Sequence, residues 1–491
     1  MEKRGDWLVE ITLLICCTGV AWAQQRGGPP GTAPPTSSSG PTEQSSQSAV
    51  NTPSPEAGET KPAKPAVTPL SGATDFSPGF QGEARSYLVP AIQWTGFGDT
   101  STGSTTAETR VQAQSTIVGS LTLQRVRRHS QLNLDYAGGG FFYSRRLKSS
   151  SNFDSPTNGV LHRLGFVQQF TWPRWQLQLS DDGLYLPESP FGFSGFGGLE
   201  SFGLGLGGGF FRQAPSLNPT FQPNQTILTG RTQRLSNVAV TQIQFNPKPR
   251  SALTLTGTYG TLFFTNPAFL DSRYWMLMAG YNFAVTRKDT VGINYGHYFL
   301  QLGAPNRELL YRGLELAYGR KVTGKLSLEL SAGAMVNQVA KELGGSVTKV
   351  FWTTRDSLQC RFRRGSVSIA FWRNVTSGSG ILVGAETYVT QFSAGRQFWR
   401  KAYASLDFGH AFNQSLSPEL GARQRRKFET WHGGARLSRE FGQHTSIYLN
   451  YTLQRQISND PFCFGDSCGR VLLRHVGGIG LNWHGRPIGL D

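Results

Sequence analysis

After its first 23 residues, the sequence has no apolar run that approaches the roughly 18 residues needed to cross a bilayer as an α-helix. Charge is also scarce: charged residues make up 16% of the 491 positions, against about 25% in average soluble domains. The hydrophobic share is only 38%, which is low for a soluble protein of several domains. Glycine (59 residues) and aromatic residues (12%) are instead abundant. This combination favours a large all-β protein.

Motifs of catalytic, metal and nucleotide sites are missing or out of context. Gly203-x-Gly205-x-x-Gly208 matches the sequence pattern of a dinucleotide-binding motif. That motif needs a preceding strand and a following helix, and the sequence around these glycines predicts no helix. The eight histidines lack metal-ligand spacing. The net charge of +17 comes from bases dispersed over turns rather than from a stripe with stacking aromatics, so nucleic acid is not an expected partner. We expect no enzyme, catalytic residue, cofactor or metal.

The first 84 residues differ from the rest of the chain. Lys3 and Arg4 precede a short apolar run, and Ala21-Trp22-Ala23 has the pattern of a cleavage site, so 1–23 is predicted to be a secretory signal peptide. Eleven of the 26 prolines fall in 24–84, interleaved with Ser, Thr, Gly and Ala. Such a composition buries too little apolar surface to offset its conformational entropy. We expect a disordered periplasmic linker over 24–84 and one folded domain over 85–491.

From residue 86 onward, apolar and polar side chains alternate with a period of two. Leu326, Leu328 and Leu330, for example, alternate with Ser327 and Glu329. The alternating runs last about 9 to 14 residues, longer than strands of soluble sheets and suited to tilted strands that cross a bilayer. We identify eighteen candidate strands, with sixteen as the alternative count, near 86–95, 112–125, 131–143, 160–172, 175–182, 232–245, 252–264, 273–285, 290–301, 309–320, 325–336, 349–362, 366–375, 384–395, 401–412, 428–440, 445–456 and 471–484.

The connections alternate in length. Even-numbered strands end in tight turns such as 127–129 and 323–324, whereas odd-numbered strands mostly end in longer polar or glycine-rich loops. This pattern is typical of an outer-membrane β-barrel, whose closure pairs every backbone N–H and C=O within the hydrocarbon. An even strand count places both termini in the periplasm. The long loops, 378–380 among them, are then expected to be exposed outside the cell.

The polar strand faces are expected to line the lumen. Four carboxylates on these faces are candidate lumen residues: Asp135, Glu315, Glu329 and Asp407. The longest insertion, 182–233, carries Glu188 and Glu200. We expect it to fold into the lumen as a constriction, with a surface flap or a subunit contact as the alternative.

Basic residues gather on the tight-turn side of the strands. They form a predicted periplasmic rim of Arg127, Arg128, Arg287, Lys288, Arg363, Arg364, Arg400 and Lys401. A ring of one sign concentrates counter-ions, but salt screens charges beyond roughly 8 Å. A weak anion preference is therefore expected, with the lumen carboxylates acting against it.

Three cysteines follow the signal peptide. Cys360 lies alone within a strand and is interpreted as a wall residue. Cys463 and Cys468 flank four residues of the last long loop. In an oxidising envelope this spacing allows a disulfide that staples the loop, and we expect one.

The strand region, together with Tyr185-Leu-Pro-Glu-Ser-Pro-Phe-Gly-Phe193 and the closing Gly480-Leu-Asn-Trp-His484, resembles the β-barrel porins of bacterial outer membranes. This loose group includes barrels associated with exopolysaccharide secretion. The resemblance implies an all-β transmembrane antiparallel barrel surrounded by outer-membrane lipid. It also implies the barrel-assembly machinery as a partner during biogenesis, with Trp483 as the terminal aromatic residue that this machinery reads. Seven residues, 485–491, follow the closing motif.

These observations predict a porin-like channel for passive or facilitated passage of small hydrophilic solutes. The alternative is a closed barrel with a structural or secretion-associated role, for example in polysaccharide export. Conductance across a planar bilayer separates the two. A homo-oligomer is compatible with either function.

Overall fold

The computed structural model describes residues 70, 86–103, 111–143, 158–186, 224–229, 232–303, 307–340, 346–416, 424–464 and 467–490. This part of the chain has no helix with the length and hydropathy that a membrane crossing requires. Its strands are β1 (Tyr87–Gly103), β2 (Val111–Val126), β3 (Ser130–Tyr143), β4 (Gly159–Thr171), β5 (Trp175–Leu186), β6 (Arg234–Lys248), β7 (Ser251–Phe264), β8 (Ser272–Ala284), β9 (Asp289–Leu302), β10 (Arg307–Lys321), β11 (Leu326–Ala340), β12 (Ser346–Phe362), β13 (Gly365–Thr376), β14 (Ala385–Trp399), β15 (Ala402–Ser415), β16 (Lys427–Phe441), β17 (Thr445–Phe464), β18 (Ser467–His484) and β19 (Ile488–Gly489).

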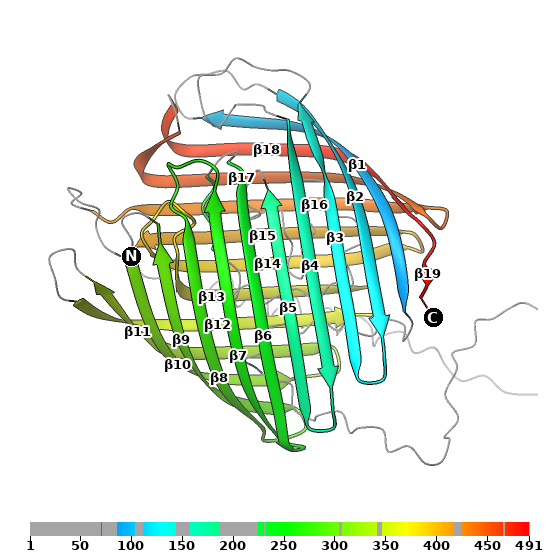
Figure 1. Ribbon diagram of the computed structural model, residues 1–491. Coiled ribbons are helices and arrows are strands. Elements are labelled where there is room, and N and C mark those ends of the chain that lie inside the picture. Colours follow the sequence, from blue (N-terminus) through cyan, green and yellow to red (C-terminus); the bar gives the residue numbers. More distant parts are fainter. Residues whose placement is uncertain are drawn as a thin grey trace, which may run out of the picture. The chain divides into compact units, whose positions relative to one another are not determined.

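Strands β1 to β18 form one antiparallel sheet in which each strand pairs with its neighbours in sequence (Figure 1). The sheet closes into a barrel because β1 pairs with β18 from Ala91↔His484 to Gly103↔Leu472. β19 is a two-residue continuation of this seam along the start of β1. The prediction of an all-β barrel of eighteen strands is confirmed.

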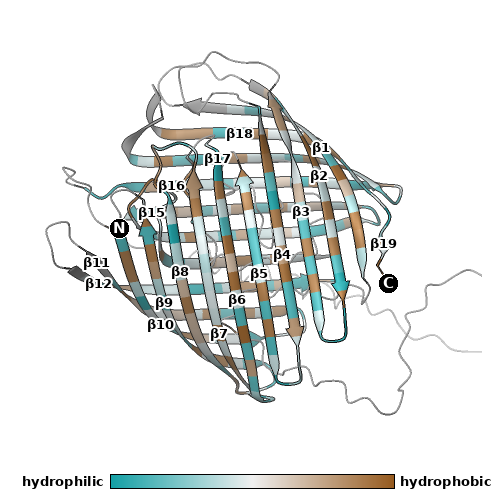
Figure 2. Ribbon diagram, viewed as in Figure 1, coloured by the Kyte–Doolittle hydropathy of each residue, from teal (hydrophilic) through white to brown (hydrophobic). Residues whose placement is uncertain are grey.

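Side chains alternate between the two faces of the barrel wall. In β1, Gln93, Thr95 and Asp99 are buried on the inner face, whereas Ile92 and Trp94 stand on the outer face with 50% and 44% of their surface exposed. The strands in Figure 2 show the same alternation of hydrophobic and hydrophilic positions. The wall therefore presents an apolar surface to its surroundings and a polar surface to the lumen, as a membrane barrel requires.

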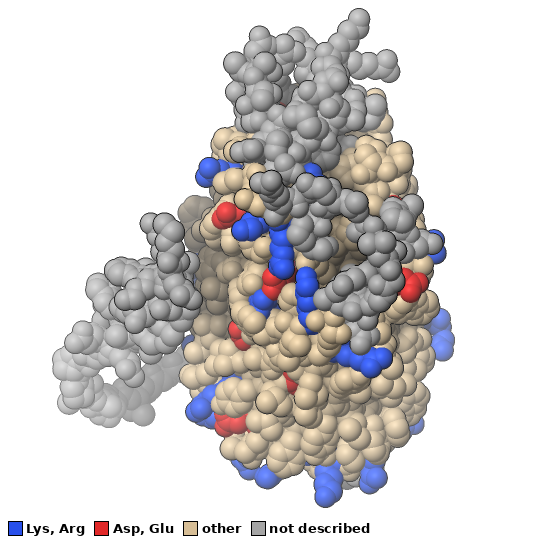
Figure 3. All heavy atoms as spheres, turned by 90° about the vertical axis from the view of Figure 1, so that its left-hand side faces the viewer, with Lys and Arg blue, Asp and Glu red and all other residues tan. Residues whose placement is uncertain are grey.

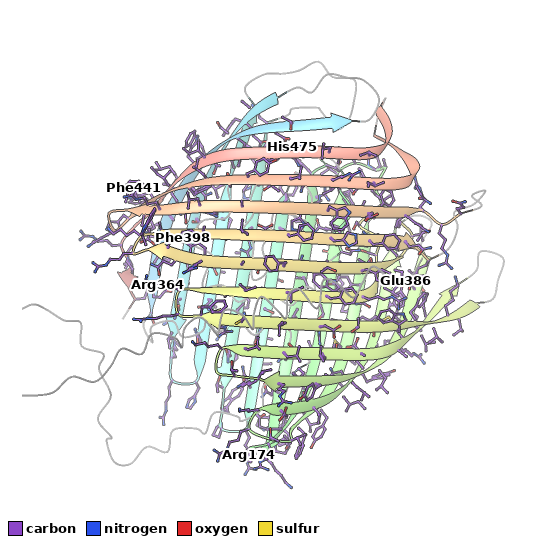
Figure 4. All side chains as sticks on the ribbon, turned by 180° about the vertical axis from the view of Figure 1, so that it is seen from behind. Arg174, Arg364, Glu386, Phe398, Phe441 and His475 are labelled. Carbon is purple, nitrogen blue, oxygen red and sulfur yellow. The ribbon has the colours of Figure 1, made fainter. Side chains whose placement is uncertain are left out.

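The connections at one end of the barrel are all tight turns, whereas most connections at the opposite end are longer. Connections of two to four residues join β2 to β3 and every second pair thereafter, and we call this the tight-turn end. Arg364, Phe398 and Phe441 stand at this end in Figure 4, and Glu386 lies toward the opposite, long-loop end. On the outer face, Trp175 stacks on Phe245 close to the tight turns, with ring centroids 4.3 Å apart. Such pairs suit an aromatic girdle.

Strands β12 and β13 separate halfway along the wall. Their pairing runs from Phe362↔Gly365 to Thr354↔Arg373 and stops there, while β13 continues on β14 to Thr376↔Ala385. Arg373 fills the separation: its guanidinium donates to the Trp352 carbonyl at 3.0 Å, lies 3.9 Å from the Trp352 ring centroid and forms an ion pair with Glu386. The side chains of Arg373 and Glu386 are only 7% and 12% exposed. Arg373 therefore links β13 to β12 through the Trp352 carbonyl where the backbone ladder between these strands ends, and its buried ion pair with Glu386 links β13 to β14.

Arg373→Met is expected to destabilise the barrel by about 3–5 kcal/mol, because it leaves the Glu386 carboxylate buried without its cation. Urea unfolding of the barrel in detergent micelles, followed by tryptophan fluorescence, measures this loss. The double variant Arg373→Met/Glu386→Met removes both charges and is expected to recover most of the stability. Equal unfolding midpoints for the wild type and Arg373→Met would show that the pair contributes nothing.

The register of β17 and β18 places Cys463 directly opposite Cys468, beyond a register shift between Ile457 and Phe462. Cross-strand opposition brings two Cα atoms within the range that a disulfide spans. Cys463–Cys468 is therefore expected to be oxidised in protein exported to an oxidising envelope. Mass spectrometry of peptides from non-reduced protein tests this directly. Two titratable thiols at these positions would exclude the bond.

Candidate functional site in the barrel lumen

One charged cluster of the lumen lies on β3, β4 and β5. Asp135 and Asp182 flank Gly165, which pairs with both residues. An added Cβ at Gly165 would lie 3.8 Å from Asp182 Oδ1, in ordinary van der Waals contact. Arg163 Nε donates to Asp182 Oδ1 at 3.1 Å, and Thr122 Oγ1 donates to Asp135 Oδ1 at 2.8 Å. Both carboxylates thus have a donor within the inner wall.

A second cluster lies on β10, β11 and β12. The Glu315 side chain extends over Gly333 and accepts a hydrogen bond from Thr353 Oγ1 at 3.1 Å. Glu329, on the inner face of β11, interacts electrostatically with Arg355 on β12. The two acids and their neighbouring base form a mixed patch rather than a field of one sign.

Two further pairs connect neighbouring strands across the inner face. His432 Nε2 lies 3.4 Å from Asp407 Oδ2, and both side chains are less than a tenth exposed. Glycines make this pair possible, because a Cβ at Gly409 would overlap the His432 ring and a Cβ at Gly434 would overlap the Asp407 carboxylate. At the closing seam, Arg474 binds Asp99 through two nitrogens, the shorter contact being 2.6 Å. Lumen charge is therefore largely paired within the wall.

The four carboxylates identified from the sequence, Asp135, Glu315, Glu329 and Asp407, all lie on inner strand faces. The sequence analysis missed their partners. Arg163, Arg355 and His432 occupy inner positions of neighbouring strands. The alternation of polar and apolar residues was sufficient to place these three side chains on the inner face. Which acid each one contacts depends on the register between strands. Asp182, the last residue of the candidate strand 175–182 and the first of the predicted insertion, was not among the predicted lumen residues; β5 continues past it to Leu186.

Two segments from the long-loop end cross the lumen, and we call 224–229 and 377–384 together the constriction. Asn224 Nδ2 donates to Thr376 Oγ1 at 2.6 Å, and Thr226 Oγ1 donates to Asn413 Oδ1 at 2.9 Å. Leu228 uses both main-chain groups, since its N–H donates to Gln456 Oε1 at 2.7 Å and its carbonyl accepts from Gln456 Nε2 at 3.1 Å. These contacts fix the first segment to the inner faces of β13, β15 and β17.

The second segment of the constriction reaches the opposite wall. The Leu270 N–H, between β7 and β8, donates to the Gly380 carbonyl at 2.7 Å, and the Ile227 N–H donates to Ser379 Oγ at 3.2 Å. Ile227, Leu228 and Leu382 pack together with Phe428 of β16 and Leu472 of β18. An apolar bridge stabilised by hydrogen bonds therefore spans the lumen near the long-loop end.

The expectation that 378–380 is exposed outside the cell is wrong. Ser379 is 1% exposed, and Gly378, Ser379 and Gly380 all have positive φ angles of 76°, 57° and 78°. This left-handed run, which glycine tolerates, turns the chain back into the barrel, where Leu382 is fully buried. The described part of the long insertion, 224–229, lies inside the barrel as expected, while Glu188 and Glu200 fall outside the described residues.

The predicted basic rim lies on the tight turns, where Arg127, Arg128, Arg287, Lys288, Arg363, Arg364, Arg400 and Lys401 are all exposed. Figure 3, which views the molecule from the left-hand side of Figure 1, has basic side chains along its lower edge. The acid Asp289 lies at the same end of the barrel. Hydrogen bonds from Thr286 at 2.6 Å and Tyr318 at 2.8 Å hold the pKa of Asp289 below its ordinary value, so it remains charged.

No protein-family model and no curated protein matches the chain. Solved structures similar to it include Acinetobacter baumannii OccAB3, with 9% identity and a TM-score of 0.42 over 81% of this chain and 99% of that one. Pseudomonas aeruginosa OccK2 (OpdF) shares 9% identity and a TM-score of 0.41 over 82% of this chain and 98% of its own. Pseudomonas aeruginosa OpdL shares 12% identity and a TM-score of 0.39 over 82% and 99%. Similarity this low transfers neither a solute nor a residue role.

Proposed function

We propose that the protein is an outer-membrane channel through which small hydrophilic solutes pass by passive or facilitated diffusion. The observation that carries this proposal is the closed eighteen-strand wall, apolar on its outer face and polar on its inner face. An apolar outer surface of this extent suits lipid rather than water. An inner surface of amides, hydroxyls and paired charges suits hydrated solutes.

The inner wall offers hydrogen-bonding groups that other described residues leave unused. Among these are side-chain atoms of Asn133, Gln178, Asn294, Asn337 and Asn450, all at least nine-tenths buried within the barrel. Buried amides normally bind a partner. Because neighbouring residues cover these atoms, a solute reaches them only when those side chains move, and the wall then presents no strong field of one sign.

The proposed orientation places the tight-turn end in the periplasm, together with both termini. Short periplasmic turns and longer external connections are general in such barrels. Trp483, the penultimate residue of β18, is 45% exposed on the outer face. In this position it is available to the assembly machinery during insertion.

Ion preference follows from the distribution of charge. The rim bases are exposed and act through screened solvent, whereas several lumen acids are balanced by Arg163, Arg355 and Arg474. Neither the basic rim nor the lumen acids therefore impose a strong ion preference. The proposed result is a channel with a weak preference for anions.

The constriction supports a second candidate function, a closed barrel with a structural or secretion-associated role. Ile227, Leu228 and Leu382 form an apolar contact across the lumen, and such a contact opposes the passage of water and ions. A barrel closed in this way would need a signal or a partner to open it.

Reconstitution into a planar bilayer decides between the two candidates. The channel function predicts discrete conductance steps in symmetric salt and, under a salt gradient, a small reversal potential of the sign that anion preference gives. A silent bilayer, with correctly folded barrel recovered from it, would favour the closed barrel. A clear cation preference would show that the lumen carboxylates outweigh the rim.

Gln456→Ala is expected to loosen the constriction, because it removes both hydrogen bonds that hold the Leu228 main chain. Conductance should rise, while the folded fraction stays close to that of the wild type. Gln244→Ala is the matched control: the same change at a buried inner-face glutamine on β6, at the tight-turn end and away from the constriction. Conductance that is unchanged in Gln456→Ala, or raised equally in both variants, would contradict a limiting role for the constriction.

A further inference from the structure

Leu70 lies inside the barrel, although it belongs to the proline-rich stretch that the sequence assigns to a linker. Its side chain is 5% exposed. Its N–H donates to Asn282 Oδ1 at 3.2 Å, and its carbonyl accepts from Arg355 Nη2 at 3.0 Å. Asn282 is on the inner face of β8 and Arg355 on the inner face of β12. Leu70 is therefore held by both of its main-chain groups, from strands 212 and 285 residues away in sequence.

Two glycines of the wall give this residue its space. A Cβ at Gly319, on β10, would lie 2.7 Å from Leu70 Cδ2. A Cβ at Gly292, on β9, would lie 2.5 Å from Asn282 Oδ1, the atom that accepts the Leu70 N–H. Larger residues at these positions would displace the leucine side chain or its hydrogen-bond acceptor. Gly292, Gly319, Asn282 and Arg355 thus form a recess that matches one leucine and both of its main-chain groups, and we call it the Leu70 site.

The Leu70 site lies toward the tight-turn end, since Asn282 and Gly319 each stand two residues before the end of their strand. β1 begins at this same end. Leu70 precedes Ser86 by 16 residues, and a chain of that length can extend about 50 Å. The linker is therefore long enough to enter the lumen from its own end of the barrel.

We propose that the Leu70 site is an intramolecular docking site for Leu70 of the linker, and that the docked Leu70 obstructs the passage by narrowing the lumen toward the tight-turn end. The chemistry is that of peptide recognition: an amide oxygen for the N–H, a guanidinium for the C=O and a glycine-lined recess for one aliphatic side chain. Tethering supplies the ligand at high effective concentration. Docking also engages Arg355, the base beside Glu329, and so alters the charge that a solute meets.

Obstruction rests on the proposed channel function, whereas docking does not. A cross-link tests docking by itself. Oxidation of Leu70→Cys/Gly319→Cys is expected to give a disulfide that mass spectrometry detects in the folded full-length barrel. Leu70→Cys/Gly257→Cys is the matched control. Gly257 lies on β7 with open space around an added Cβ, and it is on the outer face of the wall, whereas the Leu70 site is on the inner face. No cross-link with Gly319→Cys, or equal cross-linking in both proteins, would overturn the docking.

Bilayer conductance tests the obstruction. If the linker is docked in half of the molecules or more, Leu70→Gly should raise the time-averaged conductance about twofold or further. Gly319→Ala should act in the same direction, since its methyl group collides with the leucine. Val50→Gly, an apolar-to-glycine change elsewhere in the linker, is the control and should leave conductance unchanged.

The two measurements separate failure of the proposal from failure of the channel function. A specific cross-link with unchanged conductance in Leu70→Gly would retain the docking and overturn the obstruction. A specific cross-link in a barrel that never conducts, in the wild type or in any variant, would refute the proposed channel while the docking stands.

Discussion

The structure depends on one constraint: a strand within hydrocarbon must pair both of its edges. Closure through β1 and β18 meets it. Backbone pairing is hardest at the seam between β1 and β18, because Pro90 in β1 has no N–H to donate. β18 ends at His484, and the Gly485 N–H donates to the Pro90 carbonyl at 2.8 Å. The ladder resumes as β19, which pairs with Tyr87 and Leu88. The residues after the closing aromatic motif thus complete the barrel.

Once the sheet is closed, strand alternation assigns every side chain to lipid or to lumen, and glycine then decides which lumen side chains can meet. Gly409 makes room for His432, Gly434 for Asp407 and Gly333 for Glu315. Each of these polar groups lies flat against the wall, over a position where a Cβ would collide with it. The high glycine content is therefore tied to the inner surface as well as to loops. It allows large charged side chains to pair along the wall rather than project into the lumen.

Alternation and turn length are local properties, so the sequence was sufficient to predict the eighteen strands and the inner position of Asp135. It was insufficient for features that depend on distant contacts. Side-chain contacts such as Asp407–His432 require the register between strands as well as a neighbouring glycine. The composition of the glycine-rich run 378–380 predicts an exposed loop. Its position inside the barrel depends on the hydrogen bond between Gly380 and Leu270, more than a hundred residues earlier. Leu70 sits in a composition typical of disorder, and only the recess on β8 to β12 singles it out.

Both obstructions in the lumen use the same chemistry. At the long-loop end, Gln456 binds the N–H and the C=O of Leu228; toward the tight-turn end, Asn282 and Arg355 bind the N–H and the C=O of Leu70. A wall that hydrogen-bonds polar solutes is equally able to hold an extended main chain. Each such bond contributes only about 0.5–1.5 kcal/mol net, because water competes for the same groups. A solute rich in hydrogen-bonding groups therefore competes directly with the chain's own segments for the wall. If the barrel conducts as proposed, passage depends on how well the solute replaces the peptide as well as on pore width.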